Sequence, residues 1–232
     1  MPSGPYLRYA IYWTPAPGPL AGFGADWLGW DPVTGSERPH IATADLPIAQ
    51  ITARPRKYGL HATLKAPFRL ATDRTFDGLR SALDRFAGRC APVQLEGLSL
   101  ARLGKFLCLR PEGDSSALTA LAADTVQQLD SFRAPLTETE IARRRHAHLS
   151  PEADALMLRW GYPHVMARFR FHVTLTGPLD DDMAARTKRA LAPLLDPLLP
   201  RPFAIDALTL MGENENGWFH ALHRARFADA AG

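Results

Sequence analysis

Two similar segments of the sequence constrain the fold more than any other feature. Residues 61–68 read HATLKAPF and residues 172–179 read HVTLTGPL, so His, Thr, Leu and Pro recur in register at an offset of 111 positions. Each segment is followed by a helical pattern and then by a strand-like run, with residues 93–100 matching residues 203–210 at an offset of 110. A strand–helix–hairpin unit that occurs twice predicts two pseudo-symmetric lobes rather than a short-period solenoid.

The duplication predicts a single bilobal domain over residues 1–232. The first unit would cover about residues 56–111 and the second about residues 168–227. Apolar residues make up 46% of the chain, which is enough for a substantial core. Strand-like runs beside amphipathic helical patterns such as residues 75–89 indicate an α+β fold. We expect two antiparallel sheets that line a central cleft, with the helices outside.

Other stretches give weaker local predictions. The aromatic and aliphatic run Leu7–Trp13 is typical of a strand and residues 43–54 of a short helix, while residues 169–176 are expected to form a strand around the second motif. Residues 15–40 combine many Gly and Pro with bulky apolar residues, which favours a long, partly apolar loop. The basic run over residues 54–57 is typical of a solvated turn.

The duplicated segments would each place several polar side chains on one strand face, because successive residues of a strand alternate between faces. The residues expected on these polar faces are His61, Thr63 and Lys65 in the first segment, and Arg170, His172, Thr174 and Thr176 in the second. A single strand of this kind indicates little, since an isolated His-x-Thr is more often structural. Two such faces across one cleft predict a phosphate site that contains an acid and a base.

The chemistry follows from the protonation of histidine, whose ordinary pKa lies near 6.5. In-line hydrolysis of a phosphodiester needs a base that deprotonates water and an acid that protonates the leaving oxygen, and two imidazoles supply both. Thr63 and Thr174 would donate to the non-bridging oxygens, and Lys65 or Arg170 would offset the charge that develops there. Thr176 shares this face. Tyr58 either stacks on a base or sugar of the substrate or packs within the protein.

The two motifs resemble those of the 2H phosphoesterases, a superfamily with two H-x-[ST] motifs on a bilobal pseudo-twofold scaffold. Within it, "PRKYGLHATLKAPFRL", "RFHVTLTGPL", "RYAIYWTP" and "DWLGWDP" are similar to a bacterial subgroup of phosphonate-metabolism proteins. The resemblance implies a 2H phosphoesterase-like fold and cyclic phosphodiesterase or RNA-end chemistry. It also implies that the catalytic residues are His61, Thr63, His172 and Thr174. Sequence does not say which histidine is the base and which is the acid.

Composition and charge narrow the classes of ligand and partner. The net charge of +3 and the pI of about 9.1 suit an anionic substrate but are too small to indicate nucleic-acid binding by themselves. No apolar run has the length of a membrane span, and the N-terminus lacks the pattern of a signal peptide. Cys90 and Cys108 are isolated and typical of buried thiols in a reduced compartment, so we expect a cytoplasmic protein without a resident metal or cofactor and without an obligate protein partner.

We therefore expect a metal-independent phosphoesterase that hydrolyses a cyclic phosphodiester of a nucleotide or a phosphorylated sugar. One alternative is an RNA-end enzyme, either a 2′,3′-cyclic phosphodiesterase or a 2′,5′ ligase; the excess of arginine over lysine favours it, since only four of the 27 basic residues are lysine. Another alternative is a non-catalytic module that binds a nucleotide or RNA. The presence of both histidines and both threonines argues against this alternative, because binding alone does not need a matched acid and base.

Overall fold

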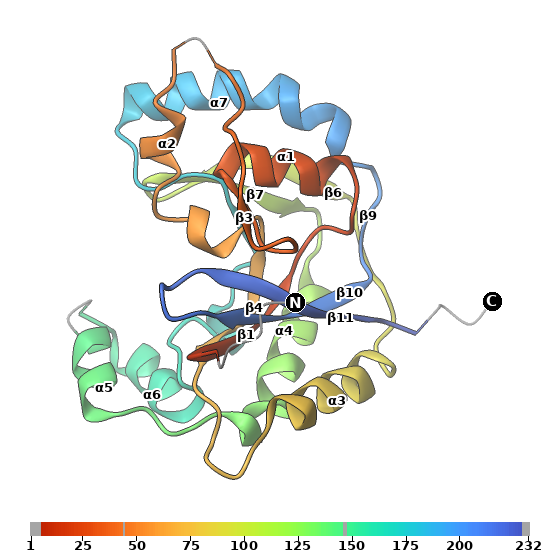
Figure 1. The fold of residues 1–232 in the computed structure, drawn as a ribbon, viewed down its shortest axis with the longest axis vertical. Helices are drawn as coiled ribbons and strands as arrows, with labels where there is room; N and C mark the ends of the chain where they lie inside the picture. Colours follow the sequence, from red (N-terminus) through yellow and green to blue (C-terminus); the bar gives the residue numbers. More distant parts are fainter. Residues whose placement is uncertain (1–5, 44, 146–147, 229–232) are drawn as a thin grey trace.

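The computed structural model describes residues 6–43, 45–145 and 148–228 and contains two main antiparallel sheets (Figure 1). The strands of the four-stranded sheet, in the order β11-β10-β1-β4, are β1 (Arg8–Trp13), β4 (Ala62–Phe68), β10 (Ala207–Glu213) and β11 (Phe219–Arg226). The strands of the three-stranded sheet, in the order β6-β7-β8, are β6 (Gly97–Leu103), β7 (Phe106–Glu112) and β8 (Val173–Thr174). The two motifs thus lie in different sheets.

Each sheet combines the motif strand from one half of the sequence with a hairpin from the other half. Strand β4, which follows His61, shares its sheet with the hairpin β10–β11 from the second half. Strand β8, which follows His172, pairs with the hairpin β6–β7 from the first half. Each sheet therefore contains strands from both repeats, and neither repeat forms a lobe by itself.

A short two-stranded pairing marks the local symmetry between the repeats. Strands β5 (Val93–Leu95) and β9 (Phe203–Ile205) run antiparallel, with Gln94 opposite Ala204. These two residues are also equivalent in the repeat, at an offset of 110 positions, and the flanking pairs exchange equivalent positions. A contact in which each segment meets its own equivalent is the signature of a twofold axis. The pseudo-twofold α+β fold with two antiparallel sheets is therefore confirmed.

Helices cover the outer faces of both sheets (Figure 1). The helix α3 (Phe76–Ala87) packs against β10 and β11, and α4 (Ser116–Gln128) packs against β4. The three-stranded sheet is covered by α7 (Asp181–Leu195). Both α3 and α7 begin at a residue whose side chain accepts a hydrogen bond from the third helical residue, Thr75 and Asp180 respectively. The helices α5 (Glu138–Arg145) and α6 (Pro151–Trp160) extend from one side of the four-stranded sheet (Figure 1).

The region expected to be a long loop contains a helix instead. Helix α1 (Pro19–Leu28) has proline in its first turn, where the missing N–H costs nothing, and ends at Gly29 in the left-handed conformation. Its Trp27 is fully buried and donates from Nε1 to the carbonyl of Leu175. The high Gly and Pro content of residues 15–40 thus marks the ends of a short buried helix. The chain continues through β2 (Trp30–Asp31) and β3 (Ser36–Glu37).

Two other elements are shorter than expected. The helix within residues 43–54 is reduced to α2 (Ile48–Ile51), which follows Pro47. The strand expected over residues 169–176 is regular only at Val173–Thr174, because β7 is its single partner within the described part of the chain.

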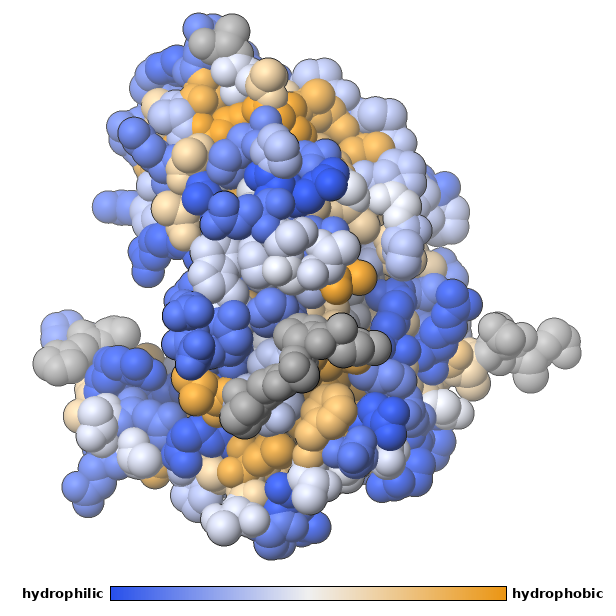
Figure 2. Space-filling model, viewed as in Figure 1, coloured by the Kyte–Doolittle hydropathy of each residue, from blue (hydrophilic) through white to orange (hydrophobic). Residues whose placement is uncertain are grey.

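Hydrophilic residues cover most of the molecular face shown in Figure 2, and a notch separates the upper part of this view from the part that carries α5 and α6. Among the described residues, no helix combines the length and apolar character needed to span a bilayer.

Candidate active site

Both motifs line one open cleft of about 810 Å³ between the two sheets. His61, Thr63, His172 and Thr174 all contribute to its wall, and all four are half-buried. The buried residues that alternate with them, Ala62 and Val173 among them, belong to the core. The alternation of a strand thus delivers the polar half of each motif to the cleft.

His61 is held by its backbone surroundings and by an aromatic ring. Its Nδ1 donates to the carbonyl of Gly59, 3.0 Å away, because a carbonyl can only accept. Gly59 adopts a φ of 70°, a conformation that favours glycine, and a Cβ there would meet the ring of Pro32 at 2.6 Å. The His61 ring stacks on that of Tyr12, with centroids 4.1 Å apart. This leaves Nε2 as the nitrogen without a partner among the described residues.

The surroundings of His61 disfavour its protonated form. Burial lowers the pKa of His61 to about 4, an effect that the hydrogen bond to Gly59 opposes and the nearby His172 reinforces. Tyr12, beneath the imidazole, is itself fully buried, and burial raises the pKa of its hydroxyl well above the ordinary value. His61 is consequently neutral at pH 7, as a general base must be before it takes a proton.

His172 repeats the anchoring of His61 in a different setting. Its Nδ1 donates to the carbonyl of Arg170, 2.7 Å away and again two residues earlier in the chain. The ring lies 5.8 Å from that of Phe106, tilted by 50°, so it lacks the close stacking seen at His61. Here too Nε2 has no partner among the described residues. The two imidazoles therefore present equivalent nitrogens from opposite sheets.

The two threonines occupy matching positions beside the histidines. Thr63 lies opposite Tyr12 in the β1–β4 pairing, and Thr174 lies opposite Cys108 in the β7–β8 pairing. Both line the cleft. Their hydroxyls form no hydrogen bond within the described part of the protein, so both are available to a phosphoryl oxygen.

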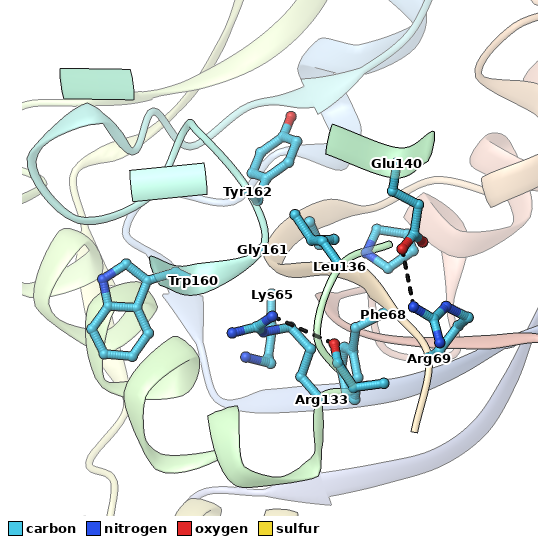
Figure 3. A pocket seen from close by; sticks show the side chains of 12 residues that line it. Lys65, Phe68, Arg69, Arg133, Leu136, Glu140, Trp160, Gly161 and Tyr162 are labelled. Atoms are coloured by element: carbon cyan, nitrogen blue, oxygen red, sulfur yellow. Dashed lines mark hydrogen bonds and ion pairs between the residues drawn. The ribbon is translucent and has the colours of Figure 1, made fainter. Parts of the chain in front are cut away.

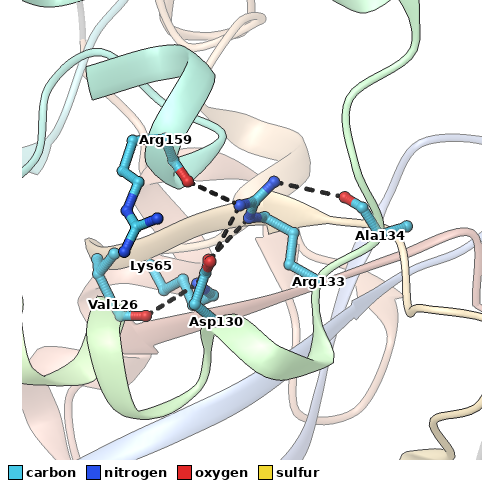
Figure 4. A network of polar contacts seen from close by, with 6 residues as sticks. All are labelled: Lys65, Val126, Asp130, Arg133, Ala134 and Arg159. Atoms are coloured by element: carbon cyan, nitrogen blue, oxygen red, sulfur yellow. Dashed lines mark hydrogen bonds and ion pairs between the residues drawn. The ribbon is translucent and has the colours of Figure 1, made fainter. Parts of the chain in front are cut away.

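Lys65 does not face the cleft, contrary to the expectation from strand alternation. The pairing of β4 with β1 shifts register between Thr63 and Lys65, which marks a bulge and turns Lys65 to the opposite face. Its Nζ donates to the carbonyl of Val126 and to Asp130, each at 3.1 Å (Figure 4). Burial lowers the pKa of Lys65 to about 8, while Asp130 opposes the change. Lys65 is thus part of the packing between β4 and α4.

The remaining expected substrate contacts divide into two groups. Arg170 is exposed, lies outside the residues that line the cleft, and donates from Nη1 to the carbonyls of Ala167 and Phe169. Thr176 does border the cleft, but its hydroxyl donates to the carbonyl of Gly177 and accepts from the backbone N–H of Leu107. Tyr58 lines the cleft, with its ring 5.6 Å from that of His61. Of the four, only Tyr58 both lines the cleft and has a side-chain polar group without a hydrogen bond among the described residues.

Several cleft residues are absent from the sequence-based site. Arg54 and Lys57, interpreted as parts of a solvated turn, line the cleft, whereas Arg56 between them donates to the carbonyls of Leu28 and Ala49. The other additions to the cleft wall with charged or aromatic side chains are Arg8, Tyr12, Phe106, Arg144 and Tyr162. They come from four separate elements or loops, and no local motif connects them. Among the described residues, no group of three or more His, Cys, Asp and Glu is placed to hold a metal ion.

A protein-family model described as "Protein of unknown function (DUF1045)" matches residues 63–220, more than half of the chain. The chain belongs to the DUF1045 family. The matched range includes Thr63, His172 and Thr174 and begins two residues after His61. The meeting of both motifs in one cleft of this DUF1045 protein agrees with the arrangement that the 2H phosphoesterase resemblance implied.

Two curated relatives carry the name ribose 1,5-bisphosphate phosphokinase PhnN. The protein from Janthinobacterium sp. (strain Marseille) is 36% identical over 218 residues, covering 90% of this chain and 48% of the relative. The protein from Laribacter hongkongensis (strain HLHK9) is 35% identical over 218 residues, covering 91% of this chain and 49% of the relative. The DUF1045 chain therefore spans about half the length of the curated relatives it matches.

Two solved structures are similar to this chain at low sequence identity. A crystal structure of a phosphoesterase is 17% identical with a TM-score of 0.44, covering 97% of this chain and 99% of the other. The crystal structure of E. coli LigT in complex with NADP+ is 15% identical with a TM-score of 0.45 and the same coverage.

Proposed function

We propose that this protein is a phosphoesterase that hydrolyses a cyclic phosphodiester of a phosphorylated sugar, with His61 and His172 as general base and general acid. One observation carries the proposal: two imidazoles from opposite sheets line one cleft, each anchored through Nδ1 to a carbonyl two residues earlier. Each Nε2 is thereby left to exchange a proton with a ligand. A matched pair of this kind is what in-line hydrolysis needs on its two sides.

The reaction can be written with His61 as the base. Its neutral Nε2 takes a proton from water as the water oxygen attacks phosphorus. The bond between phosphorus and one ester oxygen breaks on the opposite side, and His172 donates a proton to that oxygen. The products are a phosphomonoester and a free hydroxyl group. Thr63 and Thr174 donate to the non-bridging oxygens, where negative charge accumulates in the transition state.

The names of the curated relatives favour a ribose phosphate as the substrate. They are named for a kinase of ribose 1,5-bisphosphate, and this chain matches about half of each. A hydrolase that forms this bisphosphate would supply such a kinase. The cyclic diester that gives it is ribose 5-phosphate bridged by phosphate across the oxygens of C1 and C2, opened at the C2 oxygen.

The direct test is a turnover assay on a panel of cyclic diesters, followed by ³¹P NMR. The panel comprises ribose 5-phosphate 1,2-cyclic phosphate, the 2′,3′-cyclic mononucleotides and RNA oligonucleotides with 2′,3′-cyclic ends. We expect the ribose derivative to be opened to ribose 1,5-bisphosphate, and turnover to survive exhaustive chelation with EDTA. The His172→Ala protein is the control for contaminating hydrolases. Turnover of none of the panel would refute the proposal.

The same panel decides between the proposal and RNA-end chemistry. An enzyme that grips many phosphates of single-stranded RNA loses affinity with salt at a log–log slope of about −0.7 per phosphate. We expect a slope that corresponds to one or two phosphates. A steeper slope together with preference for oligonucleotides would establish the RNA-end alternative. Tight binding of a nucleotide without turnover of any substrate would indicate the non-catalytic alternative.

A further inference from the structure

A cluster of cations and phenols forms the part of the cleft wall beyond His61, and the hydrolytic chemistry does not use it. Its members from separate elements are Arg8 of β1, Lys57 and Tyr58 of the 3-10 turn η1 (Arg56–Tyr58), Arg144 of α5, and Tyr162 after α6. Catalysis by the two motifs requires none of these side chains. Their convergence therefore needs another explanation.

Arg144 is the least compensated of these cations. It is half-buried, and its Nε is buried without a hydrogen-bond partner among the described residues. Burial is the main cause that lowers the pKa of Arg144, with Glu140 opposing it and the charge of Arg8 contributing to it. A half-buried guanidinium without a bonded carboxylate is costly unless an anion completes it.

The carboxylate that could neutralise Arg144 is committed elsewhere. Glu140, one helical turn earlier in α5, accepts a hydrogen bond from Arg69 at 3.0 Å (Figure 3). It also accepts one from the backbone N–H of Thr137 at 2.8 Å. Arg144 instead lies against an aromatic ring, with Cζ 5.8 Å from the centroid of Tyr162. Arg144 therefore has no hydrogen-bonded carboxylate among the described residues, and Glu140 offsets its charge only from a distance.

Two further cations of this cluster, Arg8 and Lys57, line the same cleft as Arg144. Arg8 donates from Nε and Nη2 to Glu213, which fixes its guanidinium and leaves Nη1 unbonded within the described residues. Lys57 forms no ion pair in the same part of the protein, and its Nζ lies 5.2 Å from the centroid of the Tyr58 ring. A fixed guanidinium, an unpaired ammonium and Arg144 together supply the donors that a phosphomonoester requires.

Tyr58 connects the cluster to His61, because its ring lies next to the imidazole. The Tyr58 ring is 5.6 Å from that of His61. Tyr58 and Tyr162 line the same cleft, and Arg144 lies over the Tyr162 ring with its Cζ 5.8 Å from the ring centroid. His61 and Arg144 line one cleft of about 810 Å³, which has room for a ligand that carries two phosphoryl groups joined by a small spacer such as a sugar.

We propose that Arg144, with Arg8 and Lys57, forms a second anion subsite that binds the phosphomonoester of a substrate whose cyclic diester lies between His61 and His172. This inference rests on the proposed function and deepens it, since it makes a bis-phosphorylated compound the preferred ligand. The subsite acts in binding rather than in proton transfer. Its loss should therefore raise KM for substrates that carry the second phosphate and leave kcat nearly unchanged.

The test compares two substrates and three variants by steady-state kinetics. The substrates are the 1,2-cyclic phosphates of ribose with and without a 5-phosphate. Arg144→Gln should raise KM for the 5-phosphorylated substrate by about tenfold to a hundredfold, the usual worth of a charge-assisted contact, and leave KM for the other substrate unchanged. Arg144→Lys should recover part of the loss. Arg143→Gln, an exposed neighbour that does not line the cleft, should be silent.

The outcomes separate this inference from the proposed function. An equal effect of Arg144→Gln on both substrates, or no effect on either, would overturn the subsite while hydrolysis stands. If the wild-type protein hydrolyses neither compound, calorimetry with ribose 1,5-bisphosphate and ribose 1-phosphate decides. At least about tenfold preference for the bisphosphate that Arg144→Gln abolishes would keep the subsite, whereas no preference would refute it. Circular dichroism and thermal unfolding verify that each variant is folded.

Discussion

The two halves of the cleft present the same motif in different surroundings. His61 precedes a seven-residue strand, stacks on the buried Tyr12 and has a pKa lowered to about 4. His172 precedes a two-residue strand and has Phe106 as a tilted neighbour at 5.8 Å. Identical anchoring through Nδ1 therefore occurs in two different surroundings. Because the lowered pKa keeps His61 neutral at pH 7, we propose that His61 is the base and His172 the acid.

Replacement of either histidine should lower turnover strongly, because hydrolysis needs both the base and the acid. We expect His61→Ala and His172→Ala each to lower kcat by roughly 10²–10⁴, the usual contribution of a positioned acid or base. The double variant should lose far less than the product of the two, because acid and base act as a unit. Single-turnover kinetics on the preferred diester measures these effects. Near wild-type turnover of either single variant would remove that histidine from the mechanism.

The threonines should contribute equally in the two halves, because their positions match. Thr63→Val and Thr174→Val retain shape but remove the donor, so each should lose about 1–3 kcal/mol of transition-state binding. Thr→Ser at either position retains the donor and should be nearly silent. The measurement is kcat/KM for the four variants. A valine variant with undiminished kcat/KM, or a phospho-threonine trapped during turnover, would contradict the assigned role.

The acid side of the pH profile should sharpen the difference between the histidines. In the wild-type protein, kcat/KM should fall as pH decreases through about 4, because His61 must be neutral to accept a proton. Tyr12→Leu uncovers the imidazole and relieves the penalty on its charged form, so the limb should move up by about one unit. Phe106→Leu in the other half should leave this limb in place. NMR titration of His61 provides the matching observable, and a limb unmoved by Tyr12→Leu would refute the assignment to His61.

The smallest effect on turnover is expected at Lys65, which strand alternation predicted to contact the substrate. Lys65→Met should leave kcat and KM at wild-type values, because Nζ is bonded to Val126 and Asp130 on the far side of β4. It should lower the free energy of unfolding by roughly 1–3 kcal/mol, since those acceptors lose a buried donor. Arg170→Gln, at an exposed position, should alter neither quantity. Denaturant unfolding measures the change in stability, and steady-state kinetics measures kcat and KM. A large loss of kcat in Lys65→Met would indicate that Lys65 contacts phosphate after all.

The fold and the motif residues were predictable because they depend on local periodicity and on duplication. The repeat predicted two antiparallel sheets with helices outside, and strand alternation predicted that His61 and Thr63 share one face. The prediction for Lys65 failed two residues further along, because alternation holds only in regular pairing and β4 carries a bulge there. No residue type between Thr63 and Lys65 signals that bulge.

The rest of the cleft depends on tertiary structure that no local pattern encodes. Arg8 and Arg144 line the same cleft as His61 although α5 lies more than 120 residues after β1 in the chain. The composition of residues 15–40 concealed helix α1, whose stability comes from burial of Trp27 against Leu175 rather than from helix propensity. Contacts of this kind become visible only when the chain has folded.

The exchange of hairpins between the two sheets has a consequence for the order of folding. Strand β1 obtains its partner β10 from a segment that lies about 200 positions later, as the Arg8–Glu213 contact illustrates. During synthesis, the edge of β1 that β10 will cover stays open until Ala207–Glu213 has emerged. A high proportion of such distant pairings slows folding and prolongs exposure of unpaired strand edges. The first half of the chain is therefore expected to depend on the second for its own sheet, so that separately produced halves should assemble only when they are mixed.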